Sequence, residues 1–367
     1  MTACACFAMG FWAKMPIVVG PSMALNGYFI SHLVPLYHSW QAALMCVALS
    51  GLLLVLLSYT KYPQRIIEAL PKPLVKATMG GIGLLMMTVA IQSANIGMPG
   101  LHTAFNTQAL TGFAFTLLCM RIFQHYHIPG AGVLSILLCT LLFALYWPAT
   151  QHPTLHFNTA AWGQIHLAHP MQTVLQAAVL SLLVMFDSTS TLHALKETHP
   201  QLNTPAFQSK QQRTVRITGA TTLLGALLGL SNMGVYFESA AGLTAGARTG
   251  ISTCIVGLCI LLCCALAPYL SWIPVASPAA ILFLIAWNIT QQLRTLEWTD
   301  VRQTLPVIIT ALSIPLLKTI ADGIGLGLLS YVFLNYKQHT ISKQTGILTI
   351  VFLAYFILRL ITLGSTH

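Results

Sequence analysis

Two interrupted apolar stretches decide the fold of this chain: Pro16-Ile17-Val18-Val19-Gly20-Pro21-Ser22-Met23-Ala24-Leu25-Asn26-Gly27 and Ser231-Asn232-Met233-Gly234-Val235-Tyr236-Phe237-Glu238-Ser239-Ala240-Ala241-Gly242. In each, a Pro- or Gly-containing extended piece leads into a short helix. Non-helical backbone at membrane depth is tolerated only where it is buried or lines a cavity, because unpaired amides in lipid cost several kcal/mol each. Such breaks in corresponding places of two halves indicate a transporter site at a repeat interface.

The remainder of the chain is too apolar to form a water-soluble surface. Hydrophobic residues make up 56% of it and charged residues 7%, whereas a soluble domain carries about a quarter charged residues. Apolar runs of about 20 residues, enough to cross a hydrocarbon core of about 30 Å, recur throughout. The predicted spans are 2–13, 15–36, 40–59, 74–94, 109–123, 130–147, 171–195, 215–230, 233–247, 250–266, 273–289, 305–317, 323–334 and 347–363. The fold class is therefore an all-α multi-pass protein of the lipid bilayer.

The basic residues that produce the net charge of +10 are spread over alternate connections between spans. Twelve of the 17 Lys and Arg residues fall in four of these connections: Lys61, Arg65, Lys72 and Lys76; Lys196, Lys210, Arg213 and Arg216; Arg294 and Arg302; and Lys337 and Lys343. The connections 92–108 and 150–169 contain no Lys or Arg. Because cytoplasmic loops are enriched in these residues, we place the basic connections in the cytoplasm and predict the cytoplasmic (inner) membrane. The basic residues form no patch for nucleic acid.

The cysteines and histidines give no pattern for a metal or a cofactor. All nine cysteines lie in apolar segments, where a thiol behaves as a small hydrophobe. His152, His156, His166 and His169 share one predicted loop, but this loop has no acid or thiol that would complete a coordination shell. We predict neither a metal site nor a cofactor.

Two of the seven acidic residues, Asp187 and Glu238, lie in predicted spans next to polar or small residues. An acid at the bilayer centre costs about 2.5–3.5 kcal/mol even on lenient scales, so such residues usually face a cavity or a partner. Burial favours the protonated carboxyl, and a carboxyl that titrates on binding is what a proton-coupled carrier needs. Asp322 is assigned instead to an i,i+4 ion pair with Lys318 at a membrane edge.

Several ordered motifs resemble those of the nucleobase/cation symporter superfamily, in its guanine/hypoxanthine/adenine permease (AzgA-like) branch. The run from Gly20 to Phe29 is similar to the branch's Pro-Gly-Met-Gly-Leu-Asn-Ala signature, and the run from Phe186 to Leu192 to its Phe-Asp-Thr-x-Gly-Thr-Leu. Residues 236–242 and 246–250 are similar to Tyr-Ile-Glu-Ser-Ala-Ala-Gly and Gly-Gly-Arg-Thr-Gly. Small-for-small departures at Ala24, Gly27, Ser190 and Ala247 leave the preferred base open.

The resemblance implies a seven-plus-seven inverted repeat with core and gate domains that takes up a purine base by proton symport. It implies that Asn26, Asp187, Phe237, Glu238 and Ser239 bind substrate and that the two acids couple protons. The first repeat would cover residues 1–147, a periplasmic connection 148–170, and the second repeat with a C-terminal helix 171–367. The resemblance also implies a further helix before the segment that begins at Met1, the repeat mate of the helix that carries Asp187. Either the true start lies upstream of Met1, or the protein is a truncated relative.

Several alternatives stay open at this point. An anion carrier of the same fold, for sulfate or bicarbonate, is disfavoured because two buried acids would repel an anion. A truncated relative that does not transport, such as a sensor, is a second alternative. A membrane-embedded hydrolase is a third, but Asp187 and His193 lie six residues apart and do not share a helix face well, so we predict no enzyme. The sequence leaves the oligomeric state open, with a homodimer as one arrangement.

Overall fold

The computed structural model describes residues 1–60, 70–94, 106–126, 128, 130–146, 170–267, 272–296, 300–336 and 342–364. Its helical elements in the first half are α1 (Thr2–Ala8), the π-helix η1 (Met9–Ala13), α2 (Met23–Tyr28), the π-helix η2 (Phe29–Leu33), α3 (Val34–Tyr37), α4 (Trp40–Ser58), α6 (Lys72–Ser93), α7 (Thr107–His125) and α8 (Ala131–Tyr146). Those of the second half are α9 (Pro170–Thr198), the 3₁₀ helix η4 (Pro200–Leu202), α10 (Phe207–Leu227), α11 (Ser239–Thr244), α12 (Gly250–Ala265), α14 (Ala276–Thr290), the 3₁₀ helix η5 (Gln291–Thr295), α15 (Val301–Leu317), α16 (Ile320–Asn335) and α17 (Lys343–Gly364). The strands are β1 (Val19–Pro21) and β2 (Met233–Val235).

Within this part of the chain, three helices are long and apolar enough to cross a membrane by length and composition. They are Trp40–Ser58, Pro73–Ser93 and Pro170–Thr198. Among the shorter apolar helices, Ala276–Thr290 and Val301–Leu317 pack against Pro73–Ser93, and Gly250–Ala265 packs against the N-terminal helix Thr2–Ala8. The predicted order of spans is confirmed along the described residues, with most boundaries within four positions and a difference of eight at the start of α10.

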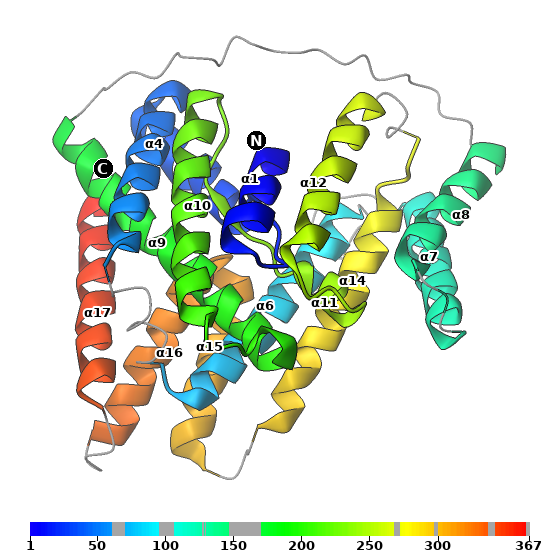
Figure 1. Ribbon diagram of the computed structural model, residues 1–367. Coiled ribbons are helices and arrows are strands. Elements are labelled where there is room, and N and C mark those ends of the chain that lie inside the picture. The colour runs from blue at the N-terminus through cyan, green and yellow to red at the C-terminus, as the bar shows by residue number, and fades with distance from the viewer. Residues whose placement is uncertain are drawn as a thin grey trace.

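One set of helices, here called the core group, consists of α1, η1, α2, α4, α9, α10, α11 and α12. In it α4 packs against α10 and α9, while α1 and η1 pack against α12 (Figure 1). Glycines permit both crossings: a Cβ at Gly51 of α4 would lie 2.6 Å from the backbone N of Leu223 in α10, and one at Gly10 would lie 2.6 Å from the Gly250 carbonyl O. Small residues bring helix backbones together in membranes in this way.

The second set, here called the gate group, consists of α6, α7, α8, α14, α15 and α16. In this group α6 packs against α14 and α15, α15 and α16 form an antiparallel pair, and α7 and α8 form another at the right of Figure 1. Contacts of α9 with α6 and α16 join the gate group to the core group. The last helix, α17, runs along the left edge of Figure 1 beside α16.

The two broken spans meet in an antiparallel strand pair. The Pro- and Gly-containing stretches are extended, as the sequence predicts. Val19 pairs with Val235, Gly20 with Gly234 and Pro21 with Met233. Pro21 supplies no backbone N–H, so it sits at the end of the short ladder, where no donor is needed. Each strand leads into a short helix, α2 after β1 and α11 after β2.

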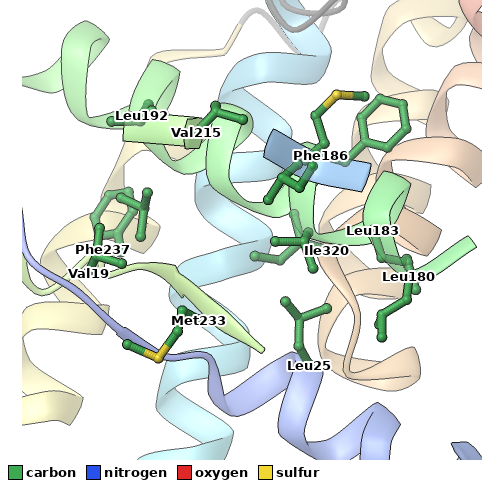
Figure 2. Close-up of a cluster of buried hydrophobic side chains, with 14 of the residues drawn as sticks. Val19, Leu25, Leu180, Leu183, Phe186, Leu192, Val215, Met233, Phe237 and Ile320 are labelled. Atoms are coloured by element: carbon green, nitrogen blue, oxygen red, sulfur yellow. The ribbon is translucent and has the colours of Figure 1, made fainter. Parts of the chain in front are cut away.

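Apolar side chains from both groups close around this strand pair. Figure 2 shows Val19 beside Phe237 on one side, and Leu183 and Phe186 of α9 beside Ile320 of α16 on the other. All five side chains are at most 7% exposed. The strands therefore pair inside the protein, where their remaining polar groups must find protein partners.

Two helices differ from their predicted lengths for local reasons. Helix α10 begins at Phe207, eight residues before the predicted span at 215. Its first turns are polar (Gln208, Ser209, Lys210, Gln211 and Gln212), so the apolar run that marks the span begins only after them. Helix α11 has only 6 residues, since the chain turns at Gly246 with φ +102°.

Several predictions fall on residues outside the described ranges. They concern the basic residues Lys61, Arg65 and Lys337 and all of the connection 148–170 except Pro170, including its four histidines. These stay predictions.

Candidate functional site

The strand pair is held by backbone groups that extend the ladder at both ends. Ser22 N–H donates to the Asn232 carbonyl at 3.0 Å, and Tyr236 N–H donates to the Val18 carbonyl at 2.9 Å. The Tyr236 hydroxyl then donates to the Pro21 carbonyl at 2.9 Å, which ties the second strand across the first. These bonds fix Ser22 and the residues after Val235 relative to each other.

Asp187 lies on α9 opposite the end of this ladder. Its side chain is 7% exposed, and its Oδ2 accepts a hydrogen bond of 3.4 Å from the Ser22 hydroxyl. A Cβ added to Gly234 would lie 3.2 Å from the same Oδ2 and 2.9 Å from Ser22 Cβ, so only glycine leaves room for the carboxyl beside the strand. The neighbouring hydroxyls of Thr189 and Ser190 donate to carbonyls of their own helix, so they do not bond to the Asp187 carboxyl.

A cavity of about 200 Å³ opens at this point between the two helix groups. Its lining combines apolar side chains with a few polar ones, and both carboxyls, Asp187 and Glu238, belong to it. The lining residues are Ser22, Ile82, Leu85, Met86, Thr88, Val89, Gln92, Asp187, Thr191, Val235, Tyr236, Phe237, Glu238, Leu282, Lys318 and Ile320. Pockets for drug-sized ligands measure about 300–1,000 Å³, so this cavity suits a smaller molecule.

The structure brings three of the five predicted binding residues to this cavity, namely Asp187, Phe237 and Glu238. Ser239 is buried next to it, and its hydroxyl accepts a hydrogen bond of 3.0 Å from Val18 N–H. Asn26 has an exposed side chain and does not line the cavity. It lies one helical turn beyond Ser22, and at a rise of 1.5 Å per residue that turn carries it away from the strand pair.

The predicted ion pair between Lys318 and Asp322 at a membrane edge is wrong. Helix α16 begins only at Ile320, so Lys318 is not on its surface and the i,i+4 geometry does not form. Asp322 is fully buried, and its two oxygens accept hydrogen bonds from Thr319, at 2.5 Å, and from Tyr355, at 2.8 Å. Lys318 lines the central cavity instead.

A second, larger cavity of about 890 Å³ lies between α7, α8, α11 and α14. It includes Thr198 and His199, which belong to the basic connection predicted to be cytoplasmic, and Phe237 lines both cavities. His199 follows α9 and contacts the Thr244 hydroxyl at 3.2 Å. Burial lowers the pKa of His199, and its hydrogen bonds with the Leu195 and Ala240 backbone partly offset this shift.

No metal centre emerges among the described residues, because they contain no group of three or more His, Cys, Asp or Glu side chains in suitable positions. His193 lies 3.9 Å from Glu197 Oε1, one turn further along α9. The chemistry of the central cavity is therefore that of two carboxyls, one ammonium and several hydroxyl and amide groups.

Sequence reasoning missed the other polar residues at the cavity, which are Ser22, Thr88, Gln92, Thr191, Tyr236 and Lys318. Ser22 stands directly after the last proline of the first break, so its place in the sequence was a usable signal. The position of Lys318 was a misleading signal, because a lysine four residues before an acid commonly forms an ion pair on a helix.

A small cavity with paired carboxyls, bounded by two broken spans that pair as strands between two helix groups, is the arrangement of a secondary transporter. The chain is therefore a multi-pass integral membrane transporter.

The comparisons with known proteins agree with this class. A model described as the Permease family (Xan_ur_permease) matches residues 1–326, and the chain belongs to this family. The resemblance drawn from the motifs is thereby confirmed.

Similar proteins include the guanine/hypoxanthine permease PbuG of Bacillus subtilis, which is 28% identical over 97% of this chain and 84% of the relative. The adenine permease AdeP of Escherichia coli is 24% identical over 97% of this chain and 82% of the relative. Among solved structures, the transmembrane domain of the cyanobacterial bicarbonate transporter BicA matches with a TM-score of 0.60 at 16% identity, over 90% of this chain and 89% of that one. This match confirms the predicted seven-plus-seven inverted-repeat fold.

Proposed function

We propose that this protein carries purine nucleobases (hypoxanthine, guanine or adenine) into the cell by proton symport across the cytoplasmic membrane. One observation carries the proposal: Asp187 and Glu238, from two different elements of the core group, line the same small cavity beside the strand pair. A purine offers ring N–H groups along its edge, and carboxyl oxygens accept such bonds. The names of the relatives PbuG and AdeP support the same substrate class.

Proton coupling follows from the surroundings of the two carboxyls. Asp187 is buried, with a hydroxyl of Ser22 as its hydrogen-bond donor. Two carboxylates that share one small cavity repel each other, so protonation of one makes their joint burial easier. In this proposal a proton binds with the base and both are released together on the cytoplasmic side. Phe237, next to Glu238, covers the bound base, and Ser239 supports the edge of the site through its hydrogen bond with Val18 N–H. Asn26, which lies outside the cavity, is not given a contact with the base.

An anion substrate is the second candidate, because the fold is shared with BicA and because Lys318 brings a positive charge to the cavity. Two carboxyls against one ammonium leave a net negative cavity when all three are ionised. A negatively charged site disfavours sulfate or bicarbonate. We therefore rank purine transport first.

Uptake assays decide between these substrates. Cells that lack their own purine uptake systems, once they produce this protein, are expected to accumulate labelled hypoxanthine, guanine or adenine, and an uncoupler is expected to abolish the accumulation. Asp187→Asn and Glu238→Gln should each lower uptake at least about tenfold, since each removes an acceptor and a proton site. Glu197→Gln is the matched control, an acid on α9 that does not line the cavity.

Uptake that neither carboxyl variant changes would refute the site. Uptake of sulfate or bicarbonate without any uptake of purine would favour the anion carrier. Binding of a base without transport would favour the sensor.

Three further proposals accompany the main one. We propose repeats at 1–147 and 171–367 on either side of the periplasmic connection 148–170, transport without an enzymatic step, and a homodimer in the membrane. The last is tested by the mass of the purified protein in detergent from light scattering.

A further inference from the structure

Lys318 is the one basic residue among those that line the central cavity, where it joins Asp187 and Glu238. It lies in the tight turn between α15 and α16. Ile320, two residues further on, packs beside Leu183 in the middle of α9 (Figure 2). The turn that carries Lys318 therefore lies against the middle of α9, the helix that carries Asp187.

The backbone at Lys318 is strained. Its φ of 56° and ψ of 22°, at the C-terminal end of α15, lie in the left-handed region, which L-residues other than glycine, asparagine or aspartate rarely adopt. Strain of this kind persists where the surroundings hold it, and it is concentrated at functional sites. A glycine would adopt this conformation more easily, so the lysine is not there for the sake of the turn.

Hydrogen bonds on the far side of the turn hold Lys318 in place. Thr319 donates to Asp322, and the hydroxyl of Tyr355 from α17 donates to the other oxygen of the same carboxylate. Asp322 lies in the first turn of α16, where a negative charge favours the helix N-terminus. The buried acid thus fixes the start of α16 and, with it, the direction in which the preceding lysine leaves the backbone.

The polar groups of the cavity are unevenly divided between donors and acceptors. The carboxyls accept, the Ser22 hydroxyl already donates to Asp187, and the Tyr236 hydroxyl already donates to Pro21. A lysine ammonium has three donors and no acceptor. Lys318 is therefore the charged donor of the cavity, beside the neutral Gln92 amide and Thr191 hydroxyl, and it suits an acceptor atom of the substrate.

We propose that the Lys318 ammonium donates a hydrogen bond to the ring carbonyl oxygen of an oxopurine and makes the carrier prefer hypoxanthine and guanine to adenine. The inference rests on the proposed transport of purines. Hypoxanthine and guanine have a carbonyl oxygen at C6, where adenine has an amino group that donates. Two donors facing each other leave both unpaired, and hydrogen bonds to charged groups contribute about 1.5–3 kcal/mol, so we expect at least a tenfold preference.

Equilibrium binding of labelled hypoxanthine to the purified full chain in detergent, with unlabelled adenine as competitor, tests this assignment. Lys318→Met should weaken hypoxanthine binding at least tenfold and change adenine binding less than threefold, while Lys318→Arg should keep part of the preference. Lys14→Met is the matched control, because Lys14 also has a left-handed backbone (φ 52°) at a helix end but does not line the cavity. Lys318→Gly removes the ammonium and the strain together, and it replaces the Met variant if that protein does not fold.

Each outcome is decisive. A Lys318 variant that binds both bases as the unaltered protein does, or that loses both equally, overturns the selective role of Lys318 and leaves the proposed function standing. An unaltered protein that binds neither base overturns the proposed function, and the role of Lys318 with it.

Discussion

At the scale of single residues, Gly234 controls how closely the second strand approaches Asp187. A Cβ there would lie 2.9 Å from Ser22 Cβ and 3.2 Å from Asp187 Oδ2, closer than side chains normally pack. Gly234→Ala should therefore push β2 away, break the Ser22–Asp187 hydrogen bond and destabilise the protein by about 1–3 kcal/mol. Thermal unfolding in detergent and hypoxanthine binding measure the two effects.

Gly242 in α11 offers the matched substitution. A Cβ there meets only Ala247 Cβ at 3.9 Å, which is an ordinary contact, and alanine favours the helix by about 0.5–1 kcal/mol over glycine. We expect Gly242→Ala to keep both stability and binding. Equal unfolding temperatures and equal hypoxanthine binding of the Gly234→Ala and Gly242→Ala variants would mean that stability and binding do not depend on the close approach of β2 to Asp187.

The Ser239 hydroxyl could either stabilise the fold or bind substrate, and substitutions at this position distinguish the two roles. It accepts the Val18 N–H at 3.0 Å, and its loss leaves that amide unpaired at a cost of about 1–3 kcal/mol. We expect Ser239→Ala to lower the unfolding temperature while hypoxanthine still binds, and Ser239→Thr to restore stability. Lost binding in a protein that unfolds at the normal temperature would assign Ser239 to the substrate instead.

At the scale of helices, the crossing of α4 and α10 depends on Gly51. An added Cβ would lie 2.6 Å from the backbone N of Leu223 and 2.8 Å from the Gly219 carbonyl, and backbone cannot move aside as a flexible side chain can. Gly51→Ala should destabilise the protein by about 1–3 kcal/mol or more, because overpacking forces the helices apart. Gly346→Ala in α17, where nothing lies within 4 Å, is the control and should be neutral or stabilising in the same thermal unfolding assay.

The sequence predicted elements better than it predicted the site. Both breaks could be found because proline and glycine interrupt a membrane helix in a way that few other causes explain. Asp187 and Glu238 could be found because charge in an apolar span is rare. Lys318 could not, because its place at the cavity depends on how the α15–α16 turn packs against α9, a contact between segments more than 100 positions apart in the sequence. The position of Asn26 depends in turn on the direction in which α2 leaves the strand pair.

At the scale of the whole molecule, the orientation in the membrane follows from the distribution of basic residues, and it predicts which connections can be labelled from outside. The turn around Asn203 lies between Lys196 and Lys210 and should face the cytoplasm, whereas the connection 148–170 should face outward. In a protein without its nine cysteines, a membrane-impermeant maleimide applied to intact cells should label Thr159→Cys and leave Asn203→Cys unlabelled until the cells are opened. Asn203 is exposed, so poor access within the protein would not explain a missing signal. The reverse labelling would place the larger cavity, which includes His199, on the outer side, and the proposed direction of base release would then be wrong.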